Sequence, residues 1–173
     1  MKPVPLHLLP DSATVQADGS LAIGGCDVGE LAGRFGTPLF IYDEAHLRAR
    51  CAEAVAAFGP GRAYYATKAF LCTVMARLAY EEGMHLDVAS GGELYVALRA
   101  GVPANALAFH GNNKSLAELR MAITEGVRHI VVDSFDELDR LESLHAEGLP
   151  APKVLARITP GVHAHTHEFI ATG

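Results

Sequence analysis

A single lysine interrupts an otherwise apolar and aromatic run, "RAYYATKAFL", at residues 62–71. Lys68 stands where this run ends, and a lysine at the end of a buried strand can form an imine with a carbonyl compound when its amine is neutral. The apolar neighbours Ala66, Ala69 and Phe70 favour the neutral amine, because a half-buried apolar setting penalises the charged form. The alternative is a strand-end lysine whose ammonium group reaches into solvent.

Other polar residues also follow apolar runs. Asp87, in "HLDVAS", could pair with Lys68 or carry protons, although strand-end aspartates often only cap helices. His110, in "FHGNNKS", could line a ligand site or could be structural. The stretch "SGGEL" (90–94) places two glycines at a helix start, where bare amides can approach an anion, and it fits an ordinary tight turn equally well.

Three alternating histidines near the end of the sequence raise the question of a metal. In "HAHTHE" (163–168), an extended backbone would put His163, His165 and His167 on one face and Glu168 on the other. The preceding "PGV" indicates a loop, and nothing upstream supplies a partner that would orient metal-bound imidazoles. We therefore predict no metal site.

The apolar runs recur at a nearly constant interval, which predicts strands that alternate with helices. The predicted strands are 63–68, 85–90, 106–111, 129–134 and 153–159. Capping boxes are predicted at Ser115 with Glu118 and at Ser134 with Glu137. Glycines that fit helix ends are Gly101, Gly126 and Gly148. The residues predicted to form helix faces packed on the sheet are Phe135, Leu138, Leu141 and Leu144, and Val74, Met75, Leu78 and Ala79.

Strands and helices that alternate through short loops predict a parallel α/β sheet, for which two architectures compete. A doubly wound sheet expects a glycine-rich phosphate turn after its first strand, and "ATKAFLC" is not one. A (β/α)8 barrel expects polar groups at the C-terminal ends of many strands. We favour the barrel because such groups follow every predicted strand: Lys68; Asp87 with Ser90; His110 with Asn112 and Asn113; Asp133 with Ser134; and Arg157 with Thr159.

About five strands cannot close a barrel that takes about 250 residues. We therefore expect a truncated, partial barrel that neither folds well alone nor is active, because it would expose two sheet edges and an apolar interior. Short strands are predicted at 21–25 and 38–43, with a small helix beginning near Asp27 and a longer helix from about Asp43. We assign residues 1–37 to a lead-in associated with a second, β domain, and residues 38–173 to the incomplete barrel.

Composition excludes several classes of function. The formal charge of −6 and the lack of a basic run argue against a nucleic-acid partner. The prolines of "MKPVPLHLLPD" interrupt any signal-peptide core, and no window is apolar enough to span a membrane, so we expect a cytoplasmic protein. The three cysteines match neither a zinc motif nor a disulfide framework.

Six ordered segments resemble the N-terminal part of the diaminopimelate decarboxylase family, pyridoxal phosphate enzymes of the alanine-racemase-like fold. They are "IGGCDVGELAGRFGTPLFIYDEAHLRAR", "YYATKAF", "LDVASGGEL", "FHGNNKS", "VVDSFDEL" and "HAHTHEFIATG". The resemblance implies that Lys68 binds pyridoxal phosphate covalently, with Asp87 as the carboxylate beside it. It places Arg157 near the cofactor and His110 and Glu93 at or behind the pocket wall, and makes 163–168 a loop near the site mouth.

The activity implied by the resemblance is decarboxylation of meso-2,6-diaminopimelate to L-lysine, with Lys68 and Asp87 catalytic and with a homodimer as the complete assembly. Two alternatives stay open on the same scaffold. One is a related ornithine- or arginine-type decarboxylase, and the other is a non-catalytic barrel protein that binds pyridoxal phosphate. A third, without the cofactor, makes Lys68 the imine-forming lysine of an aldolase-type barrel.

Overall fold

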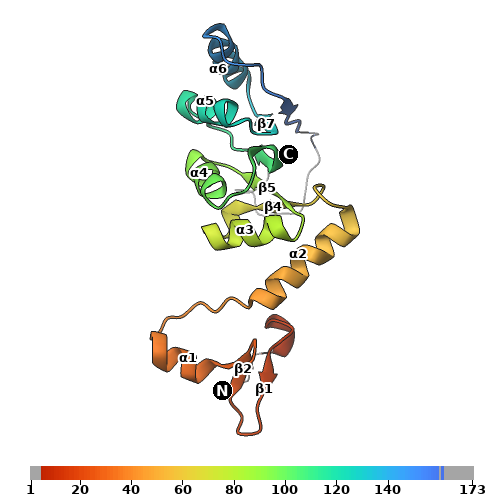
Figure 1. Cartoon of the computed structure of the whole chain (residues 1–173), viewed down its shortest axis with the longest axis vertical. Coiled ribbons are helices and arrows are strands. Elements are labelled where there is room, and N and C mark those ends of the chain that lie inside the picture. The colour runs from red at the N-terminus through yellow and green to blue at the C-terminus, as the bar shows by residue number, and fades with distance from the viewer. Residues whose placement is uncertain (1–4, 160, 162–173) are drawn as a thin grey trace.

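The computed structural model describes residues 5–159 and 161 of the chain (Figure 1). Two separate sheets organise these residues: a three-stranded antiparallel sheet and a five-stranded parallel sheet. None of the helices in the described part has the length and apolarity that a bilayer-spanning helix needs. The calls made on 163–168 lie outside the described residues.

The N-terminal sheet is small and lies at the lower end of the molecule in Figure 1, apart from the parallel sheet. Its elements are η1 (Leu6–Leu8), β1 (Thr14–Val15), β2 (Leu21–Ile23), β3 (Cys26–Asp27) and α1 (Val28–Phe35). Helix α1 begins as predicted, because the Asp27 side chain accepts a hydrogen bond from the amide of Glu30. The assignment of 1–37 to a second domain stays a prediction.

Helix α2 (Glu44–Phe58) connects the two sheets, and its first two turns carry contacts with the N-terminal unit. Asp43 caps the helix by accepting from the His46 amide, and the same carboxylate accepts from the Ser12 hydroxyl. The Asp11 amide donates to Nδ1 of His46 at 3.1 Å, and the Asp11 carboxylate forms an ion pair with Arg50 at 3.5 Å. The predicted long helix from Asp43 is confirmed.

The parallel sheet confirms the five predicted strands, each shorter than its apolar run. The strands are β4 (Tyr64–Ala66), β5 (His85–Val88), β6 (Leu107–Phe109), β7 (His129–Val132) and β8 (Val154–Ala156). They lie in the order in which the chain makes them, and all neighbours are parallel. A doubly wound sheet would reverse this order at a switch point, so the topology is that of a partial (β/α)8 barrel.

Helices cover one face of this sheet. They are α3 (Thr73–Glu81), α4 (Gly91–Arg99), α5 (Leu116–Glu125) and α6 (Phe135–Ala146), with short turns η2 (Thr67–Ala69) and η3 (Ala104–Ala106). Figure 1 shows the four helices stacked along the same side of the strands. Leu86 and Val88 of β5 are fully buried in the core with the helices, whereas His85 and Asp87 stay partly exposed. Side chains alternate along a strand, so the polar residues face the concave side.

Two predictions about apolar residues are wrong. Residues 38–43 form no strand, because no described strand pairs with them; instead Tyr42 stacks on Phe70 with ring centroids 4.4 Å apart. Among the predicted helix faces, Met75, Leu78, Ala79, Leu141 and Leu144 are buried. Phe135 is 85% exposed and Val74 71%, because both stand in the first turn of a helix, where no described segment covers them.

Serine caps begin α4, α5 and α6, and each is followed by a glutamate at the third helical position. Ser90, Ser115 and Ser134 accept from the amides of Glu93, Glu118 and Glu137. The box predicted at Ser115 is complete; the one at Ser134 is not, because Glu137 accepts instead from the amide of Asp133. Each glutamate also contacts the strand–helix turn of the previous βα unit, and we call these three residues the bridging glutamates. The bridges are Glu93 to Thr67, Glu118 to Gly91 and Glu137 to Lys114.

Gly111, in the turn after β6, is a position where the backbone conformation and the close packing both require glycine. Its φ is +102°, and a Cβ on it would lie 2.6 Å from the carbonyl oxygen of Ala89. We predict that Gly111→Ala lowers the free energy of unfolding by about 2 kcal/mol or more, since strain and a backbone clash combine. Gly126→Ala is the control: φ is +78° with nothing within 4 Å, so the loss should be about 1 kcal/mol. Equal losses in urea denaturation would contradict this.

Candidate active site

A hollow of about 460 Å³ opens at the C-terminal ends of the parallel strands. The residues that line it are Lys68, Asp87, Ala89, His110, Gly111, Asn112 and Arg157. Four of the five site residues expected from sequence thus meet around one space, although they come from four different βα units. The fifth, Glu93, lies behind the wall.

Lys68 sits two residues beyond the end of β4, in the 3₁₀ turn η2. Tyr65 holds this turn by donating its hydroxyl to the carbonyl of Phe70 at 2.6 Å. The expected half-buried apolar neighbourhood is found only in part, because Ala66 and Phe70 are half-buried whereas Lys68 and Ala69 are exposed. Among the described residues the Lys68 amine takes part in no hydrogen bond or ion pair, so it is open to a ligand.

Asp87 and His110 form a hydrogen-bonded pair in the wall of the hollow. The two strand registers bring them together, because Asp87 lies beside Ala66 in β4, and the His110 amide donates to the carbonyl of Val88 at 2.7 Å. The Nδ1 atom of His110 contacts the Asp87 carboxylate directly. Since a carboxylate only accepts, Nδ1 carries the hydrogen and Nε2 is the nitrogen left for other partners.

Arg157 completes the hollow from the end of β8. Its amide donates to the carbonyl of Val132 at 2.9 Å, and its guanidinium group pairs with Asp133 at 3.1 Å. Both side chains keep part of their solvent exposure, at 45% for Arg157 and 22% for Asp133. Asp133 therefore fixes the direction of a cation that still has donor groups for an anionic ligand.

Glu93 does not touch the hollow; it positions the residues that do. Its carboxylate accepts from the Ala89 amide at 2.7 Å and from the Thr67 hydroxyl at 2.7 Å. Thr67 is 1% exposed, and its hydroxyl also lies 2.8 Å from the carbonyl oxygen of Asp87. Glu93 therefore holds Thr67, which directly precedes Lys68. Through Thr67 it is also linked to the backbone of Asp87. We did not find Thr67 from the sequence, because a threonine at a strand end carries no distinctive pattern.

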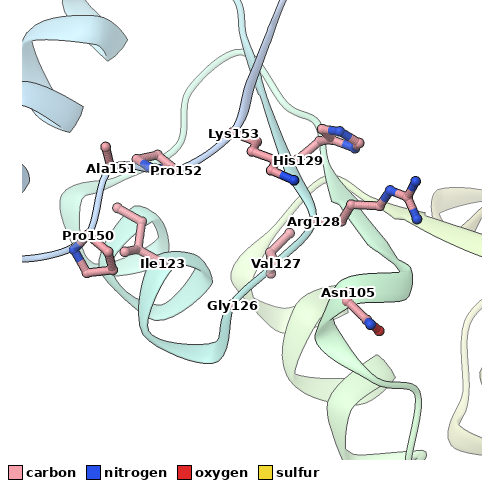
Figure 2. Close-up of a pocket in the computed structure, with 10 residues that line it drawn as sticks. All are labelled: Asn105, Ile123, Gly126, Val127, Arg128, His129, Pro150, Ala151, Pro152 and Lys153. Atoms are coloured by element: carbon pink, nitrogen blue, oxygen red, sulfur yellow. The ribbon is translucent and has the colours of Figure 1, made fainter.

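A second hollow, of about 530 Å³, lies near the opposite ends of the strands and gathers basic residues (Figure 2). Arg128, His129 and Lys153 line it, and Figure 2 shows them at the starts of two neighbouring strands. Barrels carry chemistry at the C-terminal ends of strands, and this hollow is lined by none of the five site residues expected from sequence. No group of three metal-ligating side chains occurs among the described residues.

The histidines at this end should make stability depend on pH. Burial, together with the positive charges of Arg128 and Lys153, lowers the pKa of His129, and burial with Arg128 and His129 lowers that of His85. In the unfolded chain both rings recover their ordinary pKa near 6.5 and bind protons more readily. The free energy of unfolding should therefore fall as pH drops through and below 6.5.

We predict that His129→Gln or His85→Gln flattens the fall in the free energy of unfolding between pH 7.5 and 5.5. Each change should remove a few tenths of a kcal/mol of that fall, since both rings are partly exposed and solvent screens the repulsion. Urea denaturation at the two pH values measures the effect. His145→Gln is a control on an exposed helix end, and a variant curve as steep as the original would count against the prediction.

Residues 44–173 match the family model described as the pyridoxal binding domain of pyridoxal-dependent decarboxylases. The chain belongs to this decarboxylase family. The cofactor of the family is pyridoxal phosphate, which is the cofactor expected from the sequence. The residue assignments around it stay predictions, and the geometry above is what supports them.

Relatives of this chain carry the names of decarboxylases. The diaminopimelate decarboxylase of Mycobacterium leprae is 52% identical over 167 residues, which are 96% of this chain and 35% of the relative. A solved diaminopimelate decarboxylase from M. jannaschii, in co-complex with L-lysine, is 35% identical with a TM-score of 0.77, covering 89% of this chain and 37% of the other. A lysine/ornithine decarboxylase from Vibrio vulnificus with putrescine is 26% identical with a TM-score of 0.65, covering 76% and 35%. The chain spans about a third of the length of the curated relatives it matches.

Proposed function

We propose that the chain forms the cofactor-binding part of an enzyme that decarboxylates meso-2,6-diaminopimelate to L-lysine. The observation that carries the proposal is the convergence of Lys68, Asp87, His110 and Arg157 on one hollow at the C-terminal ends of the strands. Family membership makes the cofactor pyridoxal phosphate. The names of relatives that share about half of the sequence with this chain support the proposed substrate.

The residues of the hollow fit pyridoxal phosphate. An exposed primary amine can form an imine with the aldehyde of the cofactor, and Lys68 opens onto the hollow. The guanidinium of Arg157 is a cation that can interact with the anionic groups of cofactor or substrate. The hollow of about 460 Å³ falls in the range of volumes typical of small-molecule sites.

The reaction removes a carboxylate as carbon dioxide, and a proton takes its place on the same carbon. Bound pyridoxal phosphate supplies the electron sink that accepts the bonding pair. Lys68 would hold the cofactor, and its amine is a group of the hollow that could accept or donate a proton. Asp87 orients His110 through the Nδ1 hydrogen, which leaves Nε2 to face the ligand. Asp133 holds Arg157 in its direction at the edge of the hollow.

A decarboxylase of the ornithine or arginine type is the second candidate, and the Vibrio vulnificus lysine/ornithine enzyme supports it as a structural neighbour. Its identity of 26% is about half of the value for the Mycobacterium leprae diaminopimelate decarboxylase, which is why we place it second. A barrel protein that binds pyridoxal phosphate without turnover is the third candidate. The aldolase-type lysine without the cofactor is set aside, because the family binds pyridoxal phosphate. The homodimer and the cytoplasmic location remain predictions.

Reductive labelling tests the role of Lys68. After incubation with pyridoxal phosphate and reduction with borohydride, we predict a pyridoxyl group on Lys68, located by mass spectrometry of the digest. Lys68→Ala and a denatured sample are the controls, and both should lose this selective label. Labelling spread over all lysines, or absent from Lys68 in a folded sample, would sink the assignment.

A substrate panel tests the reaction on the longest gene product that contains this chain. We predict release of carbon dioxide from meso-diaminopimelate with L-lysine as the product. For ornithine and arginine we predict a kcat/KM at least 100-fold lower. Both lack the second carboxylate, so the group of the site that pairs with it would be left without a partner. Preference for ornithine or arginine would favour the second candidate. Cofactor labelling without turnover of any of the three amino acids would favour the third candidate.

A further inference from the structure

We propose that the buried ion pair between Lys114 and Glu137 positions the walls of the cofactor hollow, so that both are positioning residues for the site. This rests on the proposed function, because the groups they position are those of the cofactor hollow. Neither residue lines the hollow, and neither was among the site residues expected from sequence.

Lys114 and Glu137 are almost completely buried, with side chains 1% and 4% exposed. The Lys114 ammonium lies 2.7 Å from Glu137 Oε1 and donates to the carbonyls of Gly111 at 2.5 Å and Val131 at 2.7 Å. The two carbonyls are its hydrogen-bond acceptors, and the contact with Glu137 is electrostatic, because Oε1 forms no hydrogen bond with any described residue. The other Glu137 oxygen, Oε2, accepts from the Asp133 amide at 2.9 Å.

Two of the backbone groups held by this pair belong to Gly111, in the wall, and to Asp133, the partner of a wall residue. Gly111 lines the hollow and directly follows His110, the partner of Asp87. Asp133 is the partner of Arg157. One buried pair therefore fixes the turn after β6, which presents the imidazole, and the turn after β7, which orients the guanidinium group.

Stability alone is a weak reason for such a pair. Removing two charges from water costs free energy that their attraction often does not recover, and apolar replacements of similar size are frequently neutral or stabilising. An apolar pair cannot supply the hydrogen bonds of the ammonium group to the turn after β6 and to β7. Nor can it supply the bond from the Asp133 amide to the Glu137 carboxylate. The geometry thus points to position as the contribution of Lys114 and Glu137.

The chain offers a matched control for the experiment. Arg120 and Glu147 form an ion pair that, like Lys114 and Glu137, links the α5 unit to the α6 unit, but both side chains are about half exposed and neither lines the hollow. Arg120→Met with Glu147→Met removes the same charges between the same units without touching the turns. Any effect specific to Lys114 and Glu137 should be absent from this variant.

The test compares Lys114→Met, Glu137→Gln and the double variant Lys114→Met with Glu137→Met, all in the longest gene product that contains this chain. Lys114→Met leaves a buried carboxylate unpaired, so its urea midpoint should fall most. The double variant should recover most of that midpoint. It should nevertheless bind pyridoxal phosphate at least fivefold more weakly and shift the pH midpoint of the absorbance of the bound cofactor.

A second readout needs no cofactor. Diethyl pyrocarbonate modifies histidines, and its rate at His110, followed by mass spectrometry of the unloaded protein, should rise at least threefold in the double variant while His145 is unchanged. Glu137→Gln keeps an acceptor for the Asp133 amide, so its His110 rate should lie between those of the original protein and the double variant. This variant serves as the test if the double variant does not fold. Rates and affinities equal to those of the control variant would overturn the proposal. If the original protein binds no pyridoxal phosphate, the proposed function fails, and the His110 rate alone decides the role of the pair.

Discussion

The reach of each bridging glutamate to the preceding strand–helix turn is the contact on which the C-terminal rim of the sheet depends. A capping glutamate has two oxygens, and one would suffice to complete its own helix end. Here each carboxylate also binds a neighbour: the Thr67 hydroxyl, the Gly91 amide or the Lys114 ammonium. The rim is therefore a series of turns that are each tied to the next, and the residues of the hollow stand on those turns. Preorganised site residues need such support, because small displacements of reacting groups are costly.

Alternation along the strands separates structure from chemistry. The residues that point toward the helices, such as Leu86, Phe109 and Ile130, are completely buried. Those that point to the concave side include Asp87, which stands on the wall of the hollow. A one-residue slip of β5 would exchange the two sets, so the same packing that holds the helices on the sheet also keeps Asp87 beside His110.

Sequence patterns predicted the parallel sheet because its signals are local. Apolar runs mark the strands, serine and glutamate mark the helix starts, and strand-end polar residues mark the hollow. The errors concern properties that depend on distant partners. Residues 38–43 have the composition of a strand but find no strand to pair with. Phe135 stands three residues before Leu138 on the predicted helix face, but no described segment packs against its side chain.

Lys114 illustrates why part of the site could not be predicted. Within "HGNNKS", a lysine among polar residues is typical of a solvated loop, yet this one is 2% exposed. Its burial follows from Glu137, which is one βα unit away in the sequence and is itself recognisable only as a cap. The exposure of Lys68 is the converse case, since its apolar neighbours in the sequence do not surround it in space.

The direction of the bridges has a consequence for synthesis. Each one runs from a glutamate back to a turn that was made earlier, so a ribosome has released the turn of Thr67 well before Glu93 emerges, and that of Gly91 before Glu118. A rim turn is therefore completed only when the following unit leaves the exit tunnel. Order should then spread along the rim from the N-terminal end, always one unit behind the growing chain.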